Sequence, residues 1–229
     1  MVALIFSKNR AMQLDALLRS MEENFDYCVV VFVLYTATNK EHQDGYDKLI
    51  SDKRAVFIKQ TDFKKNTEDI IREFGHVCIL CDDDIYYKRV KNKPKIKHHE
   101  TYSVRLGSNV ANKRYFDYTI SLDGNVFLAY DLLPLLEKEQ YNNPNDLEKV
   151  LVKSQNQFKQ IYDEQCLIGI PHNRVSTGSG CSFSGGYTED SLAINFNVGF
   201  RIDYKAMDFS NIDNVHKDID YKFYNINND

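Results

Sequence analysis

Four short apolar segments stand out in the first third of the chain. They are rich in β-branched and aromatic residues and recur at fairly even intervals, at residues 2–6, 28–35, 55–59 and 76–81. Segments that are apolar on every position are typical of strands that a parallel sheet buries on both faces. The pattern therefore predicts four buried parallel strands.

The stretches between these segments predict helices. Residues 10–24 carry an apolar stripe at i, i+3, i+4 spacing, formed by Met12, Leu14, Leu17, Leu18 and Met21. Two further helices are predicted over 40–52 and 64–75, the second ending at Gly75, where a helix stop is expected. Strand and helix in alternation indicate right-handed βαβ units. We predict an α/β protein with a Rossmann-like, mostly parallel sheet flanked by helices.

After residue 86 the alternation weakens. Residues 101–130 mix short strands and turns, and a strand is predicted over 166–175. Helices are predicted over 131–138 and 146–165, the second capped by Asn145 or Asp146. No Ser/Gly/Pro linker divides the chain, so we predict one domain over 1–229, with halves over 1–85 and 86–200, a smaller mixed sheet in the second half, and a tail over 201–229.

Composition sets further bounds. The net charge of −4 argues weakly against a nucleic-acid coat, so nucleic acid is a partner that we do not favour. The five cysteines are odd in number, with at least three in apolar runs, which is typical of reduced thiols in a cytosolic protein. The run over 28–35 is shorter than the roughly 20 residues that span a bilayer, and no signal-peptide pattern opens the sequence. We expect a cytoplasmic protein without a transmembrane segment.

Three consecutive carboxylates, Asp82, Asp83 and Asp84, come directly after the fourth predicted strand. Ligands of α/β sheets bind beyond the carboxyl ends of the parallel strands. Carboxylate oxygens suit hard divalent ions such as Mg²⁺ or Mn²⁺, and phosphate oxygens fill the open positions of such an ion. The triplet therefore predicts a divalent metal that carries a diphosphate; the alternative is a solvated acidic turn.

A βαβαβαβ half that ends in an Asp-x-Asp motif resembles the nucleotide-binding half of GT-A glycosyltransferases. Residues 3–21 also resemble the opening of family-2-like bacterial and viral members, and residues 121–136, 143–148 and 170–175 resemble later segments of those enzymes. The resemblance covers most of residues 1–175. It implies a single GT-A domain that binds a nucleotide sugar, UDP-linked, with its first half and the acceptor with its second.

The resemblance also implies an activity and a set of site residues. A hexosyltransferase-type enzyme would use Mn²⁺ or Mg²⁺ and pass a sugar to a glycan, a lipid-linked acceptor or another hydroxyl. The implied nucleotide-sugar contacts are Phe6, Ser7, Asn9, Arg10, Tyr35, Asp62, Asp82 and Asp83. The implied metal ligands are Asp82, Asp84 and His172. For Arg10 the implied partner is the diphosphate, and a solvated position near a helix start is the alternative.

Inverting members of this class need a general base in the acceptor cleft. Residues 143–148 supply Asp146 and Glu148 at the head of a helix, and we prefer Glu148. Acidic residues that complement a helix N-terminus are the alternative interpretation. Asp123 is the rival base, although its Asp-Gly pair also fits a hairpin turn.

Two other functions stay open. A sugar-phosphate nucleotidyltransferase shares the α/β layer but normally has a Gly-rich loop after its first strand, and none is present here. A non-catalytic nucleotide-binding module is the other. The basic loop over 88–99 would receive an acidic or phosphorylated acceptor or nucleic acid, or is simply solvated. The Gly- and Ser-rich residues 176–186 suit a lid or a slack loop.

Overall fold

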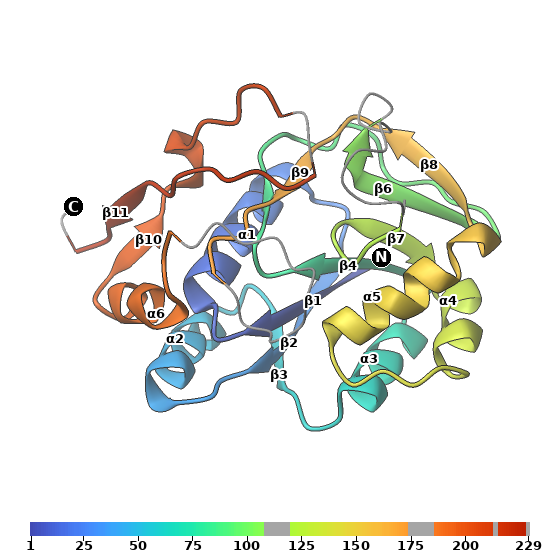
Figure 1. The fold of residues 1–229 in the computed structure, drawn as a ribbon, viewed down its shortest axis with the longest axis horizontal. Coiled ribbons are helices and arrows are strands. Elements are labelled where there is room, and N and C mark those ends of the chain that lie inside the picture. The colour runs from blue at the N-terminus through green and yellow to red at the C-terminus, as the bar shows by residue number, and fades with distance from the viewer. Residues whose placement is uncertain (108–119, 174–185, 213–214, 228–229) are drawn as a thin grey trace.

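The structure, a computed structural model, describes residues 1–107, 120–173, 186–212 and 215–227. A seven-stranded sheet with the order β3-β2-β1-β4-β7-β6-β8 runs through it (Figure 1). Its strands are β1 (Val2–Lys8), β2 (Val30–Thr36), β3 (Val56–Lys59), β4 (His76–Cys81), β6 (Glu100–Gly107), β7 (Asn125–Leu128) and β8 (Lys159–Asp163). The first four are mutually parallel, β7 is antiparallel to both neighbours, and β8 is parallel to β6. The predicted fold class is confirmed.

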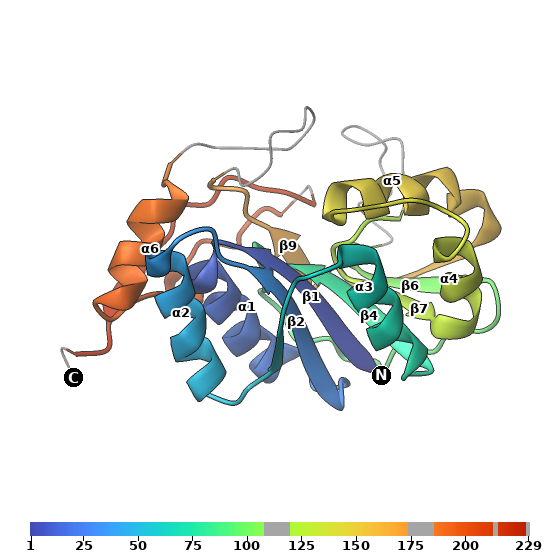
Figure 2. The same cartoon turned by 90° about the horizontal axis from the view of Figure 1, so that it is seen from below.

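Helices cover both faces of this sheet. They are α1 (Ala11–Asn24), α2 (Lys40–Ser51), α3 (Phe63–Arg72), α4 (Ala129–Leu136), α5 (Pro144–Lys153) and α6 (Glu189–Asn197). Figure 2 shows α1, α2 and α6 on one side and α3, α4 and α5 on the other. Alternate residues of β1 enter the two cores, since Ala3 and Ile5 pack toward α1 while Leu4 and Phe6 pack toward α3. This two-sided burial is why the strand is apolar on every position.

One predicted helix is wrong over half its length. Helix α5 ends at Lys153, and after a 3₁₀ turn, η1 (Gln155–Gln157), the chain forms strand β8 rather than more helix. The cap also lies earlier than predicted. Asn143 accepts a hydrogen bond from the Asp146 amide, and Pro144 occupies the first turn, where its missing N–H costs nothing.

The C-terminal residues are folded into the molecule. Helix α6 packs on α1 and α2, and β10 (Phe200–Ile202) pairs with β11 (Phe223–Asn225) on either side of a 3₁₀ turn, η2 (Tyr204–Ala206). A second small sheet pairs β5 (Asp84–Tyr86) with β9 (Leu167–Gly169), and Gly169 forms a further bridge to His216. Within the described residues no helix is long and apolar enough to cross a membrane.

Candidate functional site

The candidate site lies at the carboxyl ends of β1 and β4. These strands are parallel neighbours, so the residues just beyond the end of each face one another. The Arg10 guanidinium lies between them: Nη1 donates to Asp82 Oδ1 at 3.0 Å and to Asp83 Oδ2 at 3.2 Å. Its Nε donates to Asn173 Oδ1 at 2.6 Å, and Nη2 donates to the Asn173 carbonyl. Arg10, which is buried, therefore joins three distant segments and is the positive partner of two of the three aspartates.

Asp82 is held from both sides. Its second oxygen accepts a hydrogen bond from the Lys8 amide at 3.1 Å. Burial raises the pKa of Asp82 to about 6, because it outweighs the nearby charge of Arg10 and the charge of Asp83 adds to the rise. Asp82 therefore has more than one ionisation state in the neutral range.

The backbone amides after β1 are already bonded within the chain. Lys8 N–H donates to Asp82, Asn9 N–H to the Thr36 carbonyl at 3.0 Å, and Arg10 N–H to the Tyr46 hydroxyl at 3.3 Å. Asn9 has a left-handed backbone with φ of 60°, a conformation that Asn tolerates better than most residues. These three amides are therefore already used within the chain and do not face a phosphate as unbonded donors.

Most of the other predicted nucleotide contacts pack inside the protein. The Phe6 ring lies 5.0 Å from that of Phe63, tilted by 48°. The Ser7 hydroxyl bonds the Tyr46 hydroxyl at 2.6 Å, and the Tyr35 ring lies 4.5 Å from that of Tyr46. Asp62 is exposed and caps α3 by accepting the Lys65 amide. The nucleotide contacts of these four residues stay predictions.

Asp84 turns away from its two neighbours. It is fully buried, its Oδ2 accepts the Cys81 amide at 3.0 Å, and its Oδ1 has no hydrogen-bond partner among the described residues. Burial, followed by the negative charges of Asp123 and Asp83, raises the pKa of Asp84 well above its usual range. The buried, unbonded oxygen is the strongest indication of a missing positive ligand at this end of the sheet.

The two candidate bases lie together, although 25 residues of sequence separate Asp123 and Glu148. Burial and then the charge of Asp123 raise the pKa of Glu148, at the second turn of α5, to about 7, and the Leu122 amide donates to its carboxylate. Burial also acts to raise the pKa of Asp123, but the ion pair with Arg105 outweighs it and the net pKa is lowered. A carboxyl group whose pKa is near 7, beside a second one that stays ionised, is an arrangement suited to proton transfer.

Asp146, the other candidate base on α5, lies in a different environment from Glu148. Asp146 pairs with Lys149 at 2.9 Å and bonds Asn143, and the hydrogen bond from Lys149 lowers its pKa. Asp146 is therefore a cap residue at the surface, whereas Glu148 faces the acidic cluster. The preference for Glu148 over Asp146 agrees with this geometry, and its catalytic role stays a prediction.

Sequence reasoning missed two members of the cluster, Arg105 and His216. Arg105 is buried in β6, where Nη1 donates to Ser121 Oγ at 2.6 Å and Nη2 lies 2.9 Å from His216 Nε2. His216 lies against Gly169, where an added Cβ would come within 2.5 Å of the imidazole. An arginine between Val104 and Leu106 was a usable signal, but nothing in the polar C-terminal sequence indicates His216.

The third predicted metal ligand lies in an aromatic setting. The Nε2 atom of His172 donates to the Ile219 carbonyl at 2.6 Å, and Nδ1 lies 3.9 Å from Asp218. The ring packs 4.2 Å from that of Tyr221. No pattern in the sequence indicates these C-terminal contacts around His172.

The carboxylates of the candidate site fit a divalent cation in part. In its favour are the unbonded Asp84 oxygen and an excess of charge: five carboxylates, Asp82, Asp83, Asp84, Asp123 and Glu148, share two guanidiniums, Arg10 and Arg105. Against a preformed cage, these carboxylates do not bring three ligand atoms within 4.8 Å of one another in the described part of the chain. Oxygen ligands of this kind suit Mg²⁺ or Mn²⁺, and Asp84 is the predicted ligand that has an unbonded oxygen to hold such an ion. Both oxygens of Asp82 and the Nε2 atom of His172 are bonded within the chain, so their role as ligands stays a prediction.

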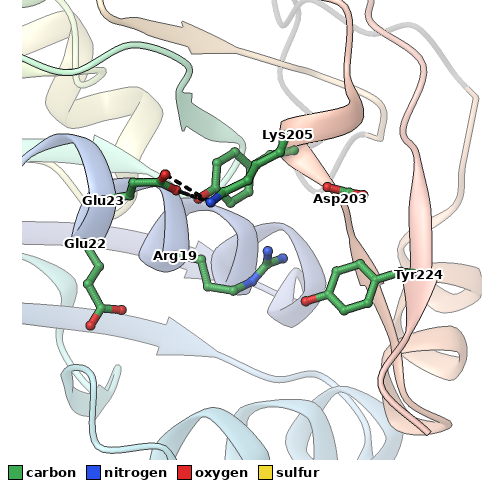
Figure 3. Close-up of a pocket in the computed structure, with 7 residues that line it drawn as sticks. Arg19, Glu22, Glu23, Asp203, Lys205 and Tyr224 are labelled. Atoms are coloured by element: carbon green, nitrogen blue, oxygen red, sulfur yellow. Dashed lines mark hydrogen bonds and ion pairs between the residues drawn. The ribbon is translucent and has the colours of Figure 1, made fainter. Parts of the chain in front are cut away.

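A separate hollow of about 560 Å³ lies further along α1 (Figure 3). Lys205 lies 3.0 Å from Glu23, and Arg19 lies 5.4 Å from the Tyr204 ring and 5.8 Å from the Tyr224 ring. Tyr204 also donates to Glu23. Both cations of this hollow therefore contact groups that line it.

Gly124 positions Asp123, and its replacement by Ala should destabilise the protein by about 2–4 kcal/mol. Its φ of +73° disfavours any side chain, and an added Cβ would lie 2.5 Å from Leu167 and 2.7 Å from Val104. Denaturant unfolding measures the loss. Gly75→Ala is the control, because no atom lies within 4 Å of an added Cβ there. Equal losses in the two variants would show that the tight turn is unimportant.

Comparisons with known proteins give fold similarities alone, since no protein-family profile and no curated protein matches the chain. A cytidylyltransferase from Leptospira borgpetersenii serovar Hardjo-bovis aligns at 13% identity and a TM-score of 0.46, over 72% of this chain and 77% of its own. The galactosyltransferase LgtC, solved with donor and acceptor sugar analogues, aligns at 12% and 0.44, over 66% and 70%. The glycosyltransferase GlyE of Streptococcus pneumoniae aligns at 12% and 0.41, over 69% and 44%. The chain is thus similar in structure to glycosyltransferases and to a cytidylyltransferase.

Proposed function

We propose that the protein is a metal-dependent glycosyltransferase that moves a sugar from a nucleotide diphosphate, UDP, to an acceptor hydroxyl. The observation that carries the proposal is the Glu148–Asp123 pair beside the aspartate cluster at the carboxyl ends of β1 and β4. A donor bound at these strand ends would place its anomeric carbon near a carboxyl group that can exchange a proton near pH 7.

In this mechanism Glu148 is the general base. The acceptor oxygen bonds to the anomeric carbon, the bond from that carbon to the diphosphate oxygen breaks, and the acceptor proton passes to the Glu148 carboxylate. Asp123 stays ionised because Arg105 pairs with it, so it does not compete for the proton. The pKa of Glu148 near 7 matches it to this task.

The phosphate side of the site is built from Arg10 and the aspartates. Arg10 pairs with Asp82 and Asp83, and Asp84, the next residue along the chain, has a buried oxygen with no hydrogen-bond partner among the described residues. When bound, a divalent ion would neutralise charge on the leaving diphosphate. The acceptor in this proposal is a glycan, a lipid-linked sugar or another hydroxyl compound.

The structure gives a reason to rank nucleotidyl transfer second. That chemistry places a triphosphate over a row of loop amides after the first strand, and here the amides of Lys8, Asn9 and Arg10 bond within the chain. A non-catalytic nucleotide-binding module is the remaining alternative. Such a module would bind the same donor, but it would not need Glu148 as a general base.

Melting curves with a panel of UDP-, GDP-, CMP- and dTDP-sugars, each with and without Mn²⁺, test the proposal. At about 100 times its Kd, the correct donor should add about 2.7 kcal/mol to the free energy of unfolding. Asp84→Asn should remove the Mn²⁺-dependent part of the shift, while Asp146→Asn, the surface control, should keep it. A melting curve that no donor moves would contradict the proposal.

A further inference from the structure

A second cluster of metal-ligating side chains lies at the opposite edge of the sheet. His98 and His99 precede β6, and Asp131 lies in the first turn of α4. Strand β7, which leads into α4, ends at Leu128 opposite His76, the first residue of β4. The cluster is therefore at the amino edge of the parallel strands, whereas Asp82 lies at their carboxyl edge.

Asp131 organises both histidines. One carboxylate oxygen pairs with His98 Nδ1, and the other accepts the backbone N–H of His99 at 2.8 Å. The carboxylate side chain is 1% exposed while the His98 ring is 58% exposed, so a buried acid holds an imidazole that is open to solvent. The Asp131 carboxylate therefore fixes the position of the His98 ring beside it.

The backbone brings the two imidazoles to the same side. Consecutive side chains of an extended chain point in opposite directions, but His99 has a left-handed backbone with φ of 57°. The two rings consequently stack with centroids 4.0 Å apart and planes 24° apart. The stacked rings bring one nitrogen atom of each histidine within 4.8 Å of the other and of a carboxylate oxygen of Asp131.

We propose that His98, His99 and Asp131 form a binding site for a divalent transition metal of the Zn²⁺ or Co²⁺ class. One potential ligand atom from each residue lies within 4.8 Å of the other two, the only such trio in the described part of the chain. Two imidazoles and one carboxylate suit Zn²⁺, Co²⁺ or Ni²⁺ rather than Mg²⁺. Three protein ligands leave a tetrahedral ion one position for water or another ligand.

Occupation of the site would join the basic loop to the body of the protein. Residues 88–99 form that loop, and Asp131 belongs to a helix whose Leu132, Leu135 and Leu136 are buried in the core. An ion held by both parts stabilises the folded state by mass action. This role is independent of the proposed sugar transfer at the far edge of the sheet.

Isothermal titration of the tag-free full chain with Zn²⁺, and the visible absorption of the Co²⁺ complex, test the site. The trio should bind one equivalent, and His98→Gln, His99→Asn and Asp131→Asn should each weaken the binding of that equivalent by about 10–100-fold. Asn is chosen at position 99 because it tolerates the left-handed backbone. The Co²⁺ spectrum should show nitrogen ligation that the His98→Gln variant reduces.

His76→Gln is the matched control, a histidine near the same edge that lies outside the trio. It should bind Zn²⁺ as the unaltered protein does, as should Asp146→Asn, a change at a surface carboxylate outside the trio. Since His98 is exposed, its variant should melt like the unaltered protein without metal. Unchanged affinity in both His98→Gln and His99→Asn, or an equal loss in His76→Gln, would overturn the proposal and leave a simple His98–Asp131 ion pair.

Discussion

Replacing Glu148 by Gln should reduce sugar transfer by about 10²–10⁴-fold while leaving donor binding close to that of the unaltered protein. Gln keeps the size of the side chain and its contact with the Leu122 amide but cannot accept the acceptor proton. Initial rates of transfer, and the donor-induced melting shift measured on the same samples, separate catalysis from binding. Because the pKa of Glu148 is about 7, the rate of the unaltered enzyme should rise with pH through that value.

Asp146→Asn is the matched control for this prediction. It makes the same chemical change on the same helix, at a surface carboxylate that pairs with Lys149, and should alter the rate by less than about twofold. If Glu148→Gln keeps full activity while Asp123→Asn loses it, the base is Asp123. Should both variants stay active, the pair has no catalytic role and a nucleotide-binding module becomes the better description.

The Glu148→Gln substitution should also change the stability of the protein, and the linkage between folding and proton binding sets the direction of the change. The folded-state pKa of Glu148, about 7, is above its ordinary value of 4.5, so the folded protein holds a proton there that the unfolded chain releases. The associated stability is fully present below about pH 4.5 and is lost as pH rises through 7. Glu148→Gln should therefore melt at a higher temperature than the unaltered protein above pH 7, and this advantage should fade in acid.

Replacing Arg10 by Met should lower the free energy of unfolding by about 3–5 kcal/mol, the largest stability loss that we predict. The variant leaves Asp82 buried without its cation and removes both bonds to Asn173. Urea unfolding at neutral pH measures the loss. Adding Asp82→Asn to the Arg10→Met variant should recover part of the lost free energy of unfolding, because the buried, unpaired negative charge at position 82 is then removed.

Arg89→Met is the control for Arg10. Its guanidinium pairs with Asp26 at 2.8 Å, but 61% of the Arg89 side chain is exposed, so solvent screens the pair and the loss should be about 0–1 kcal/mol. Similar losses in the two arginine variants would mean that Arg10 does not join β1, β4 and Asn173 energetically. The result would also weaken the proposed phosphate side of the site.

The sequence predicted the N-terminal strands because burial on both faces leaves an unmistakable pattern. The side chains from Val2 to Phe6 are all buried, so every position had to be apolar. Strand β8 was missed for the opposite reason. Lys159 and Gln160 reveal no buried face, and the strand exists because β6, far away in sequence, supplies its hydrogen-bond partners.

The sequence indicated which residue types gather at the candidate site but not how their side chains are oriented. It pointed to the aspartate triplet and to both candidate bases, whereas the direction of a side chain changes from one residue to the next. Asp84 turns inward because it opens β5, which pairs with β9, while Asp82 faces Arg10. Arg10 was predicted to meet a diphosphate, and that contact stays a prediction. The structure shows Arg10 paired with Asp82 and Asp83. No local pattern indicates a contact between residues 163 positions apart.

The distance along the chain between Arg10 and Asn173 has a consequence for synthesis. A ribosome must extend the nascent chain past residue 173 before Arg10 can bond to Asn173. It must extend the chain past residue 216 before Arg105 can contact His216. Until then Arg10 can pair with Asp82 and Asp83 but lacks its two bonds to Asn173, and Asp123 can pair with Arg105 without His216 beside them. The last third of translation should therefore be the stage at which co-translational intermediates become resistant to proteases.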